Sequence, residues 1–224
     1  MNILHFPPSS HGDPLWIPVG ASTTHRRRKP SLETWCALSG SRLLCIIDDD
    51  NLRISCRSQF SAGLSYRKLA SHLQHLTYSC EMHAVLTSPS GDNTRSVYFE
   101  QRGYLPIDIK REVVETTRGP LVKGNADLDI AFNAGYRITT GDFDVLLVGS
   151  GDGDLVLSIA RGVRRLAPSV RVYTLSVPHS SSSRILQHAA PQLIAGNFFV
   201  TDSLLQSDTP GGRSAHVGGC HNVS

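Results

Sequence analysis

The chain has 224 residues, of which 40% are hydrophobic and 18% are charged, and its formal net charge is +3. This composition is typical of a globular protein with a buried core, and it excludes a wholly disordered chain or a fibre. No apolar run approaches the roughly 18 residues of a membrane span, and residues 1–20 lack the pattern of a secretory signal. We therefore expect a cytoplasmic protein without a membrane segment.

The cysteines favour the same compartment. They are five in number and show no CxxC spacing, which is typical of reduced thiols rather than of a disulfide framework or a zinc site. The sequence leaves the oligomeric state open, a homo-oligomer included.

Both ends of the chain differ in composition from its middle. Residues 1–40 are rich in Pro, Ser, His and Arg without periodicity, and they predict a flexible arm with a basic stretch at 25–29. Residues 205–224 are rich in Gly, Ser, Asp and His, and they predict a flexible tail. One folded domain is expected over 41–204. The basic stretch is either an RNA-attracting or a solubilising segment.

Within the expected domain, apolar runs alternate with helical patterns. Strands are predicted over 42–48, 82–87, 105–114, 143–149, 170–176 and 198–200. Helices are predicted over 64–78, 92–101, 126–139, 153–166 and 181–190. Strict alternation indicates βαβ units. The fold class is therefore expected to be α/β, a Rossmann-like three-layer sandwich with a central, mostly parallel sheet.

Acidic residues gather at three places, next to predicted strand ends or helix starts. They are Asp48-Asp49-Asp50, Asp127 with Asp129, and Asp152 with Asp154. Ligands of parallel sheets bind outside the carboxyl ends of the strands, so we expect the clusters to converge there. Neighbouring carboxylates resist joint ionisation unless a cation compensates them. Mg²⁺ or Mn²⁺, which prefer oxygen ligands, would provide that compensation.

A structural explanation competes with the metal site. Aspartate at a helix start commonly caps the helix or interacts with its dipole, so each acid at 127, 129, 152 and 154 has that alternative. Capping explains the three clusters together less well, and it does not explain three adjacent aspartates after an apolar strand.

The glycines of Gly149-Ser150-Gly151-Asp152-Gly153 follow a strand and precede a helix, which is the context of a dinucleotide-binding loop. The GxGxxG motif requires glycine at position 154, where Asp154 stands. Two carboxylates would also repel a pyrophosphate. Nucleotide-cofactor binding is therefore not expected, and the glycines are interpreted as clearing space around the carboxylates.

One partial resemblance is to the haloacid-dehalogenase-like phosphatases. Asp48-Asp49-Asp50 resembles their DxDx motif, and Gly151-Asp152 resembles their late GD motif. That family usually places its last acid three or four residues further on, where this chain has Leu155 and Val156. A phosphatase is the third hypothesis.

A second resemblance covers three motifs in order. The first strand ends in D-x-x-N as Asp48 to Asn51, a K-G stretch from Lys123 leads to Asp127 at a helix start, and S-G-D-x-D is matched by Ser150 to Asp154. Together they resemble a NYN domain, one of the PIN-like group of metal-dependent nucleases that includes the bacterial LabA-like proteins. The resemblance covers about residues 42–200.

This resemblance implies a PIN-like fold, one or two Mg²⁺ or Mn²⁺ ions, and a ribonuclease that hydrolyses RNA phosphodiester bonds. The catalytic and metal-binding set carried over is Asp48, Asp127, Asp152 and Asp154. The residues expected to support it are Asn51, Asp129 and Ser150.

Basic residues near the same edge are expected to contact RNA phosphates from a loop. They are Lys110, Arg111 and Lys123. Many NYN domains carry a further aspartate six residues after the one aligned with Asp127, where this chain has Asn133. That departure favours a second hypothesis, a catalytically weak RNA-binding or regulatory module.

Overall fold

The computed structural model describes residues 35–116, 119–123, 126–180 and 193–206. The basic stretch of the predicted arm, the predicted helix over 181–190 and nearly all of the predicted tail lie outside these residues.

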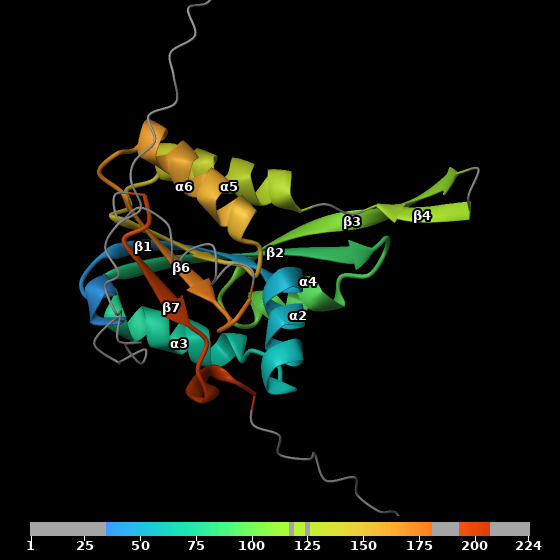
Figure 1. Ribbon diagram of the computed structural model, residues 1–224, viewed down its shortest axis with the longest axis horizontal. Coiled ribbons are helices and arrows are strands. Elements are labelled where there is room, and N and C mark those ends of the chain that lie inside the picture. The colour runs from blue at the N-terminus through green and yellow to red at the C-terminus, as the bar shows by residue number, and fades with distance from the viewer. Residues whose placement is uncertain (1–34, 117–118, 124–125, 181–192, 207–224) are drawn as a thin grey trace, which may run out of the picture.

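A seven-stranded sheet forms the centre of the molecule, in the order β4-β3-β2-β1-β5-β6-β7 (Figure 1). Six strands are parallel, and β4 pairs antiparallel with β3. The strands are β1 (Arg42–Asp48), β2 (Ser79–Pro89), β3 (Leu105–Thr116), β4 (Gly119–Lys123), β5 (Val145–Gly149), β6 (Arg171–Ser176) and β7 (Gly196–Phe199). From β1 the strand order runs through β2 to β4 on one side and through β5 to β7 on the other. Ligands of such sheets bind where the order changes direction, so a ligand is expected beyond the end of β1.

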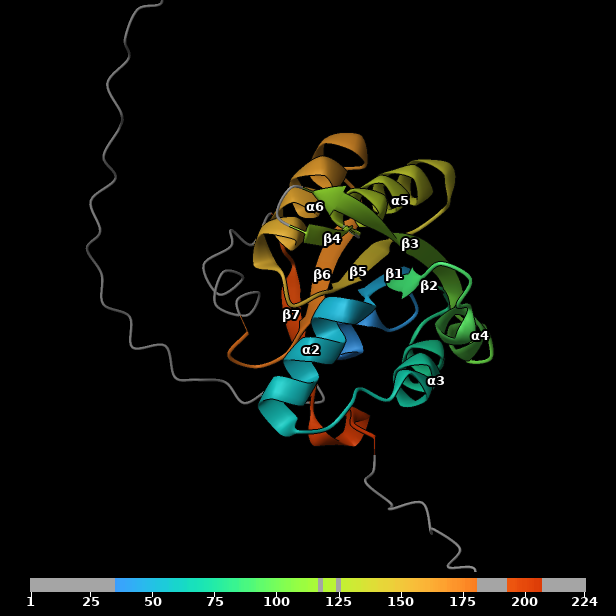
Figure 2. The same cartoon turned by 90° about the vertical axis from the view of Figure 1, so that its right-hand side faces the viewer.

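Helices cover both faces of the sheet, which confirms the predicted α/β three-layer sandwich (Figure 2). One face carries α2 (Asp49–Phe60), α3 (Tyr66–Leu76) and α4 (Thr94–Glu100), and the other carries α5 (Asp127–Thr140) and α6 (Gly153–Leu166). Two short 3-10 helices, η1 (Cys36–Leu38) and η2 (Asp202–Leu204), complete the elements.

The side chains of β1 alternate between two buried cores. Leu43, Cys45 and Ile47 pack on the face of α2 and α3, whereas Leu44 and Ile46 pack on the face of α5 and α6. A strand buried on both sides in this way reads as a continuous apolar run, as the sequence does. The run ends at Asp48, which therefore emerges at the carboxyl edge.

Apart from the short 3-10 helices, two elements were not predicted, α2 and β4. Helix α2 follows β1 directly, and only Asp49, Leu52 and Cys56 along its twelve residues are buried, so its apolar periodicity is weak. Strands β3 and β4 form a hairpin that projects from the sheet (Figure 1). The expectation of a loop between the third predicted strand and Lys123 is therefore wrong, since most of this segment is paired strand.

The packed part of the chain begins before the predicted boundary at residue 41. Trp35 is buried and stacks on Phe198, with ring centroids 4.2 Å apart. At the other end, Leu205 is buried and bridges to Leu64. Single aromatic or aliphatic anchors of this kind carry no periodicity, so the pattern of the sequence does not reveal them. In the described part of the chain, no helix combines the length and apolarity that crossing a membrane requires.

Candidate functional site

Asp48 is a buried carboxylate at the carboxyl edge, with 2% of its surface exposed. Its Oδ1 accepts a hydrogen bond from the backbone N–H of Asn51, which makes Asp48 the N-cap of α2. Its Oδ2 accepts from Asn51 Nδ2 at 2.6 Å and from Ser150 Oγ at 2.8 Å. Neighbours on two elements thus fix the position of this carboxylate.

Ser150 links Asp48 to the loop that precedes α6. The serine is fully buried, and its Oγ accepts a hydrogen bond from the backbone N–H of Asp152 at 3.0 Å. Asp152 is the N-cap of α6, because its Oδ1 accepts from the N–H groups of Asp154 and Leu155. The D-x-x-N and S-G-D-x-D motifs therefore meet through a single hydroxyl.

Asp127 begins α5 and lies within electrostatic range of Asp48. Burial raises the pKa of Asp48, hydrogen bonds from Asn51 and Ser150 partly offset this effect, and the charge of Asp127 raises the pKa further. By contrast, Asp129 and Asp154 are exposed. The structure thus brings Asp48, Ser150 and Asp152 into one network with Asp127 nearby, and it leaves the other two aspartates at the surface.

The oxygen donors of this site suit a hard divalent cation. A cation would favour the ionised form of a buried carboxylate that has a second carboxylate close by. Within the described ranges, no group of three or more His, Cys, Asp and Glu side chains is arranged to hold a metal ion. Mg²⁺ commonly binds through only one or two carboxylates and completes its shell with water and substrate phosphate. The carboxylate oxygens of Asp48 and Asp127 are of the kind that such an ion prefers.

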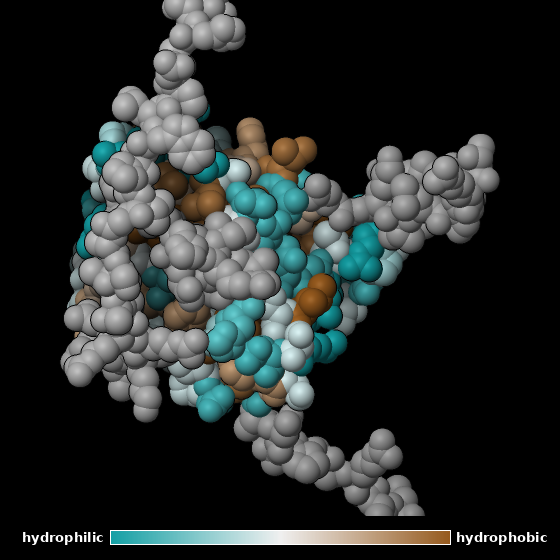
Figure 3. All heavy atoms as spheres, in the orientation of Figure 1, coloured by the Kyte–Doolittle hydropathy of each residue, from teal (hydrophilic) through white to brown (hydrophobic). Residues whose placement is uncertain are grey.

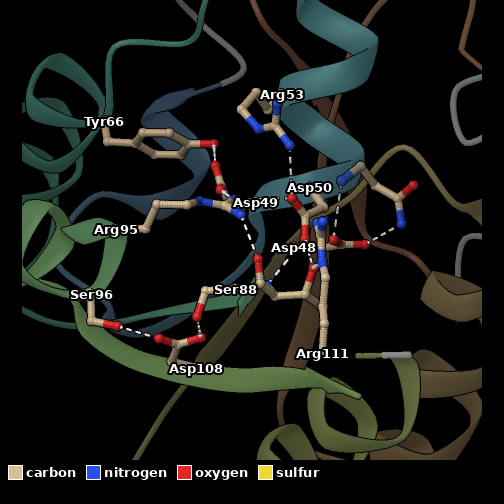
Figure 4. Close-up of polar contacts among 12 residues, drawn as sticks. Asp48, Asp49, Asp50, Arg53, Tyr66, Ser88, Arg95, Ser96, Asp108 and Arg111 are labelled. Carbon is tan, nitrogen blue, oxygen red and sulfur yellow. Dashed lines mark hydrogen bonds and ion pairs between the residues drawn. The ribbon is translucent and has the colours of Figure 1, made fainter. Parts of the chain in front are cut away.

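Capping explains more of the acidic clusters than the sequence alone indicated. Asp48 and Asp152 are both helix caps. Asp49 and Asp50 lie in the first turn of α2 and point away from Asp48, toward Tyr66 and Arg95 and toward Arg53 (Figure 4). Capping thus explains Asp48, whereas hydrogen bonds and ion pairs hold Asp49 and Asp50, so capping alone does not explain the three adjacent aspartates.

This arrangement also counts against a phosphatase. The second aspartate of the DxDx pattern is Asp50, whose Oδ2 accepts from the N–H and the hydroxyl of Thr87. Its Oδ1 accepts from Arg53 and Arg95. A carboxylate bound in this way faces β2 and the arginines rather than the site of Asp48.

The basic residues predicted to contact substrate lie on strands rather than in a loop. Lys110 and Arg111 belong to β3, and Lys123 ends β4. The ammonium of Lys110 is bound by the Asp108 carboxylate, Ser88 Oγ and the Asp92 carbonyl. Arg111 is exposed and donates from Nε to Thr87 Oγ1, so it remains the better candidate for a phosphate contact.

The glycines of the β5–α6 loop serve close packing. A Cβ at Gly149 would lie 2.6 Å from Ile47 Cδ1, and a Cβ at Gly151 would lie 2.5 Å from Ser55 Oγ and 3.1 Å from the Asn51 carbonyl oxygen. The interpretation that they clear space around the carboxylates is therefore wrong. They let the loop approach α2 and β1.

We expect Gly151→Ala to destabilise the protein by about 1–3 kcal/mol, because the added methyl group is too close to α2. The matched control is Gly162→Ala in α6, where a Cβ would meet nothing within 4 Å. That substitution should stabilise by up to about 1 kcal/mol, since alanine favours a helix over glycine. Urea unfolding measures both, and equal effects would contradict the packing role of Gly151.

The family of the chain follows from comparison of this sequence with family models. The model described as NYN domain matches residues 42–202, which is most of the chain. The chain belongs to the NYN domain family. This is a PIN-like nuclease family, and the match spans β1 to η2, so it includes every element that positions the candidate site of this NYN domain.

Solved structures support the fold. The NYN domain is similar to a protein of unknown function, VPA0982, from Vibrio parahaemolyticus RIMD 2210633, with a TM-score of 0.58 and 18% identity, covering 75% of this chain and 97% of that one. A short-chain dehydrogenase/reductase from Veillonella parvula DSM 2008, in complex with NADP, matches with a TM-score of 0.30 and 15% identity over 70% of this chain and 60% of that one, which is too low to carry an argument. No curated protein matches the chain.

Proposed function

We propose that this NYN domain is a divalent-metal-dependent ribonuclease that hydrolyses RNA phosphodiester bonds. The observation that carries the proposal is the buried, hydrogen-bonded Asp48 at the carboxyl end of β1, with its pKa raised by burial and by the charge of Asp127. A carboxylate kept in this state is suited to a cation. We also propose that the protein is cytoplasmic.

Asp48 and Asp127 would hold Mg²⁺ or Mn²⁺, and Asp152 would contribute through the carboxylate oxygen that does not cap α6. When bound, the ion lowers the pKa of a bound water and neutralises charge on the phosphodiester. Asn51 and Ser150 orient Asp48. The backbone N–H groups at the start of α6 donate to Asp152 and fix its side chain. Asp154, exposed at the start of α6, is proposed to complete the acidic edge.

The test is incubation with single-stranded RNA in Mn²⁺ and in EDTA, with a phosphomonoester as a parallel substrate. We expect RNA cleavage in Mn²⁺, its loss in EDTA, and strong reduction in Asp152→Asn. Cleavage that survives EDTA would sink the metal mechanism, and turnover of the phosphomonoester alone would favour a phosphatase.

A second function, an RNA-binding module with weak catalysis, is favoured by one observation. Asn133 stands in α5 where many NYN domains have aspartate, and among the described residues its Oδ1 is buried without a hydrogen-bond partner. RNA binding without cleavage in the same assay would support this module over the nuclease.

A further inference from the structure

A cavity lies beside α2, lined by Asp49 but not by Asp48. Its volume is about 480 Å³, and it is bounded by α2, α4 and the ends of β2 and β3. This volume falls in the range of small-molecule sites, which is roughly 300–1,000 Å³. Of the residues assigned above to the hydrolytic site, only Arg111 lines this cavity.

Four arginines line this cavity, which we call the arginine pocket: Arg53, Arg57, Arg95 and Arg111. They come from α2, α4 and β3, so only the folded chain brings them together. The surface around α2 is also hydrophilic in the space-filling view, where polar side chains form a band from the start of α6 toward α2 (Figure 3).

Two aspartates compensate part of this positive charge. Asp50 pairs with Arg53 and with Arg95, and Asp49 also pairs with Arg95 (Figure 4). In the part of the chain that the structure describes, Arg57 and Arg111 have no carboxylate partner. Four guanidinium groups beside two carboxylates leave an excess of two positive charges.

The arginines also have unused hydrogen-bonding capacity. Arg53 Nε is buried and has no hydrogen-bond partner among the described residues. Arg111 donates from Nε to Thr87 Oγ1 at 3.0 Å, and this bond does not occupy its terminal N–H groups. Burial and the charge of Arg111 lower the pKa of Arg95, and the charge of Asp108 offsets only part of this effect. Like charges held this close indicate a site that an anion would stabilise.

Three aromatic side chains also line the pocket. Tyr66 and Phe99 are buried and Tyr98 is half-buried, with the Tyr66 and Phe99 rings 4.7 Å apart in an edge-to-face contact. Aromatic walls accept the sugar or base of a nucleotide, and the planar fork of arginine matches the oxygens of a phosphate.

We infer that the arginine pocket binds a terminal phosphomonoester of an RNA strand. A phosphomonoester carries roughly −1.5 to −2 charges at neutral pH, which matches the excess in the pocket, whereas an internal phosphodiester carries one. Asp48 immediately precedes Asp49, so a strand whose end is held here runs next to the carboxylate site. The choice of RNA rests on the proposed function, but the phosphate chemistry does not.

The test is calorimetric titration in EDTA, where no metal-dependent cleavage occurs, with short RNAs that carry a 5′-phosphate, a 3′-phosphate or only hydroxyl ends. One phosphorylated RNA should bind about tenfold more tightly than the hydroxyl form, as expected for charge-assisted hydrogen bonds. Arg57→Ala and Arg111→Ala should each reduce that difference. The control Arg67→Ala removes an exposed arginine of α3 outside the pocket and should keep it.

Equal affinity for phosphorylated and hydroxyl RNA, or equal losses in Arg111→Ala and Arg67→Ala, would overturn the inference. Uridine 5′-monophosphate distinguishes the source of the phosphate: weaker binding than phosphorylated RNA supports an RNA end, and equal binding overturns it in favour of a free nucleotide. If the protein prefers phosphorylated RNA but does not cleave RNA, the proposed nuclease activity is contradicted and the pocket inference stands. If it cleaves RNA without preferring phosphorylated ends, the pocket inference is contradicted and the proposed nuclease activity stands.

Discussion

Replacing Asp48 by asparagine is expected to lower RNA cleavage by about 100-fold or more while the protein stays folded. The substitution removes the negative charge proposed to hold the metal, and even residues that only support metal ligands typically cost 10–100-fold. Asparagine caps a helix about as well as aspartate, but its amide group cannot accept the hydrogen bonds of Asp48 Oδ2, so a loss of about 1 kcal/mol is expected. The substitution also removes a buried charge whose pKa burial already raises.

The measurement is the initial rate of RNA cleavage in Mn²⁺, together with the unfolding midpoint in urea. Asp202→Asn is a matched control, since this exposed aspartate lies in η2, outside the proposed site, and it should cleave like the original chain. If Asp48→Asn kept full activity with an unchanged midpoint, Asp48 would be only a helix cap.

Replacing Asp50 by alanine is expected to destabilise the protein by about 2–3 kcal/mol. Asp50 accepts hydrogen bonds from Thr87, Arg53 and Arg95, and its side chain is 22% exposed. Removal of one partner of a largely buried ion pair leaves the other charges uncompensated. Two arginines would then repel each other beside the arginine pocket.

The same carboxylate gives this prediction a pH dependence. Burial alone would raise the pKa of Asp50, but hydrogen bonds from Thr87 and Arg53 outweigh it and lower the pKa below 3.8. A lowered folded-state pKa means that the stabilisation is present above pH 3.8 and is lost as pH falls through the folded-state value. The difference between the original chain and Asp50→Ala should therefore shrink in acid.

Urea unfolding at neutral pH and at acid pH measures both effects. The control is Asp142→Ala, which removes the 83% exposed partner of Arg42 and should shift the midpoint far less, because exposed ion pairs contribute little. A loss from Asp50→Ala no larger than that from Asp142→Ala would contradict the role of Asp50 in holding the arginines.

The order of strands and helices could be predicted because each buried strand is a short apolar run between polar segments. Arg42–Asp48 and Gly153–Leu166 have the predicted bounds. Helix α2 was missed because few of its residues are buried, although Asp48 followed by two acids is the usual signature of a helix start. The hairpin of β3 and β4 was missed because it projects from the sheet.

The acidic motifs could be found from the sequence because each is a short local pattern. The partners of the individual carboxylates could not be predicted in this way. Asp48 and Asp50 are two residues apart, yet Asp48 bonds to Ser150 and Asp50 pairs with Arg53 and Arg95. The arginine pocket has no linear pattern either, because Arg53 and Arg111 come together only through the pairing of β1, β2 and β3.

The central claim, that Asp48 and Asp127 hold a divalent cation for RNA hydrolysis, is tested most directly by Mn²⁺ binding. Electron paramagnetic resonance follows the loss of the free Mn²⁺ signal as protein is added. We predict that the original chain binds Mn²⁺ and that Asp48→Asn and Asp127→Asn each weaken binding by about tenfold or more. Equal binding by the original chain and both variants would contradict the claim.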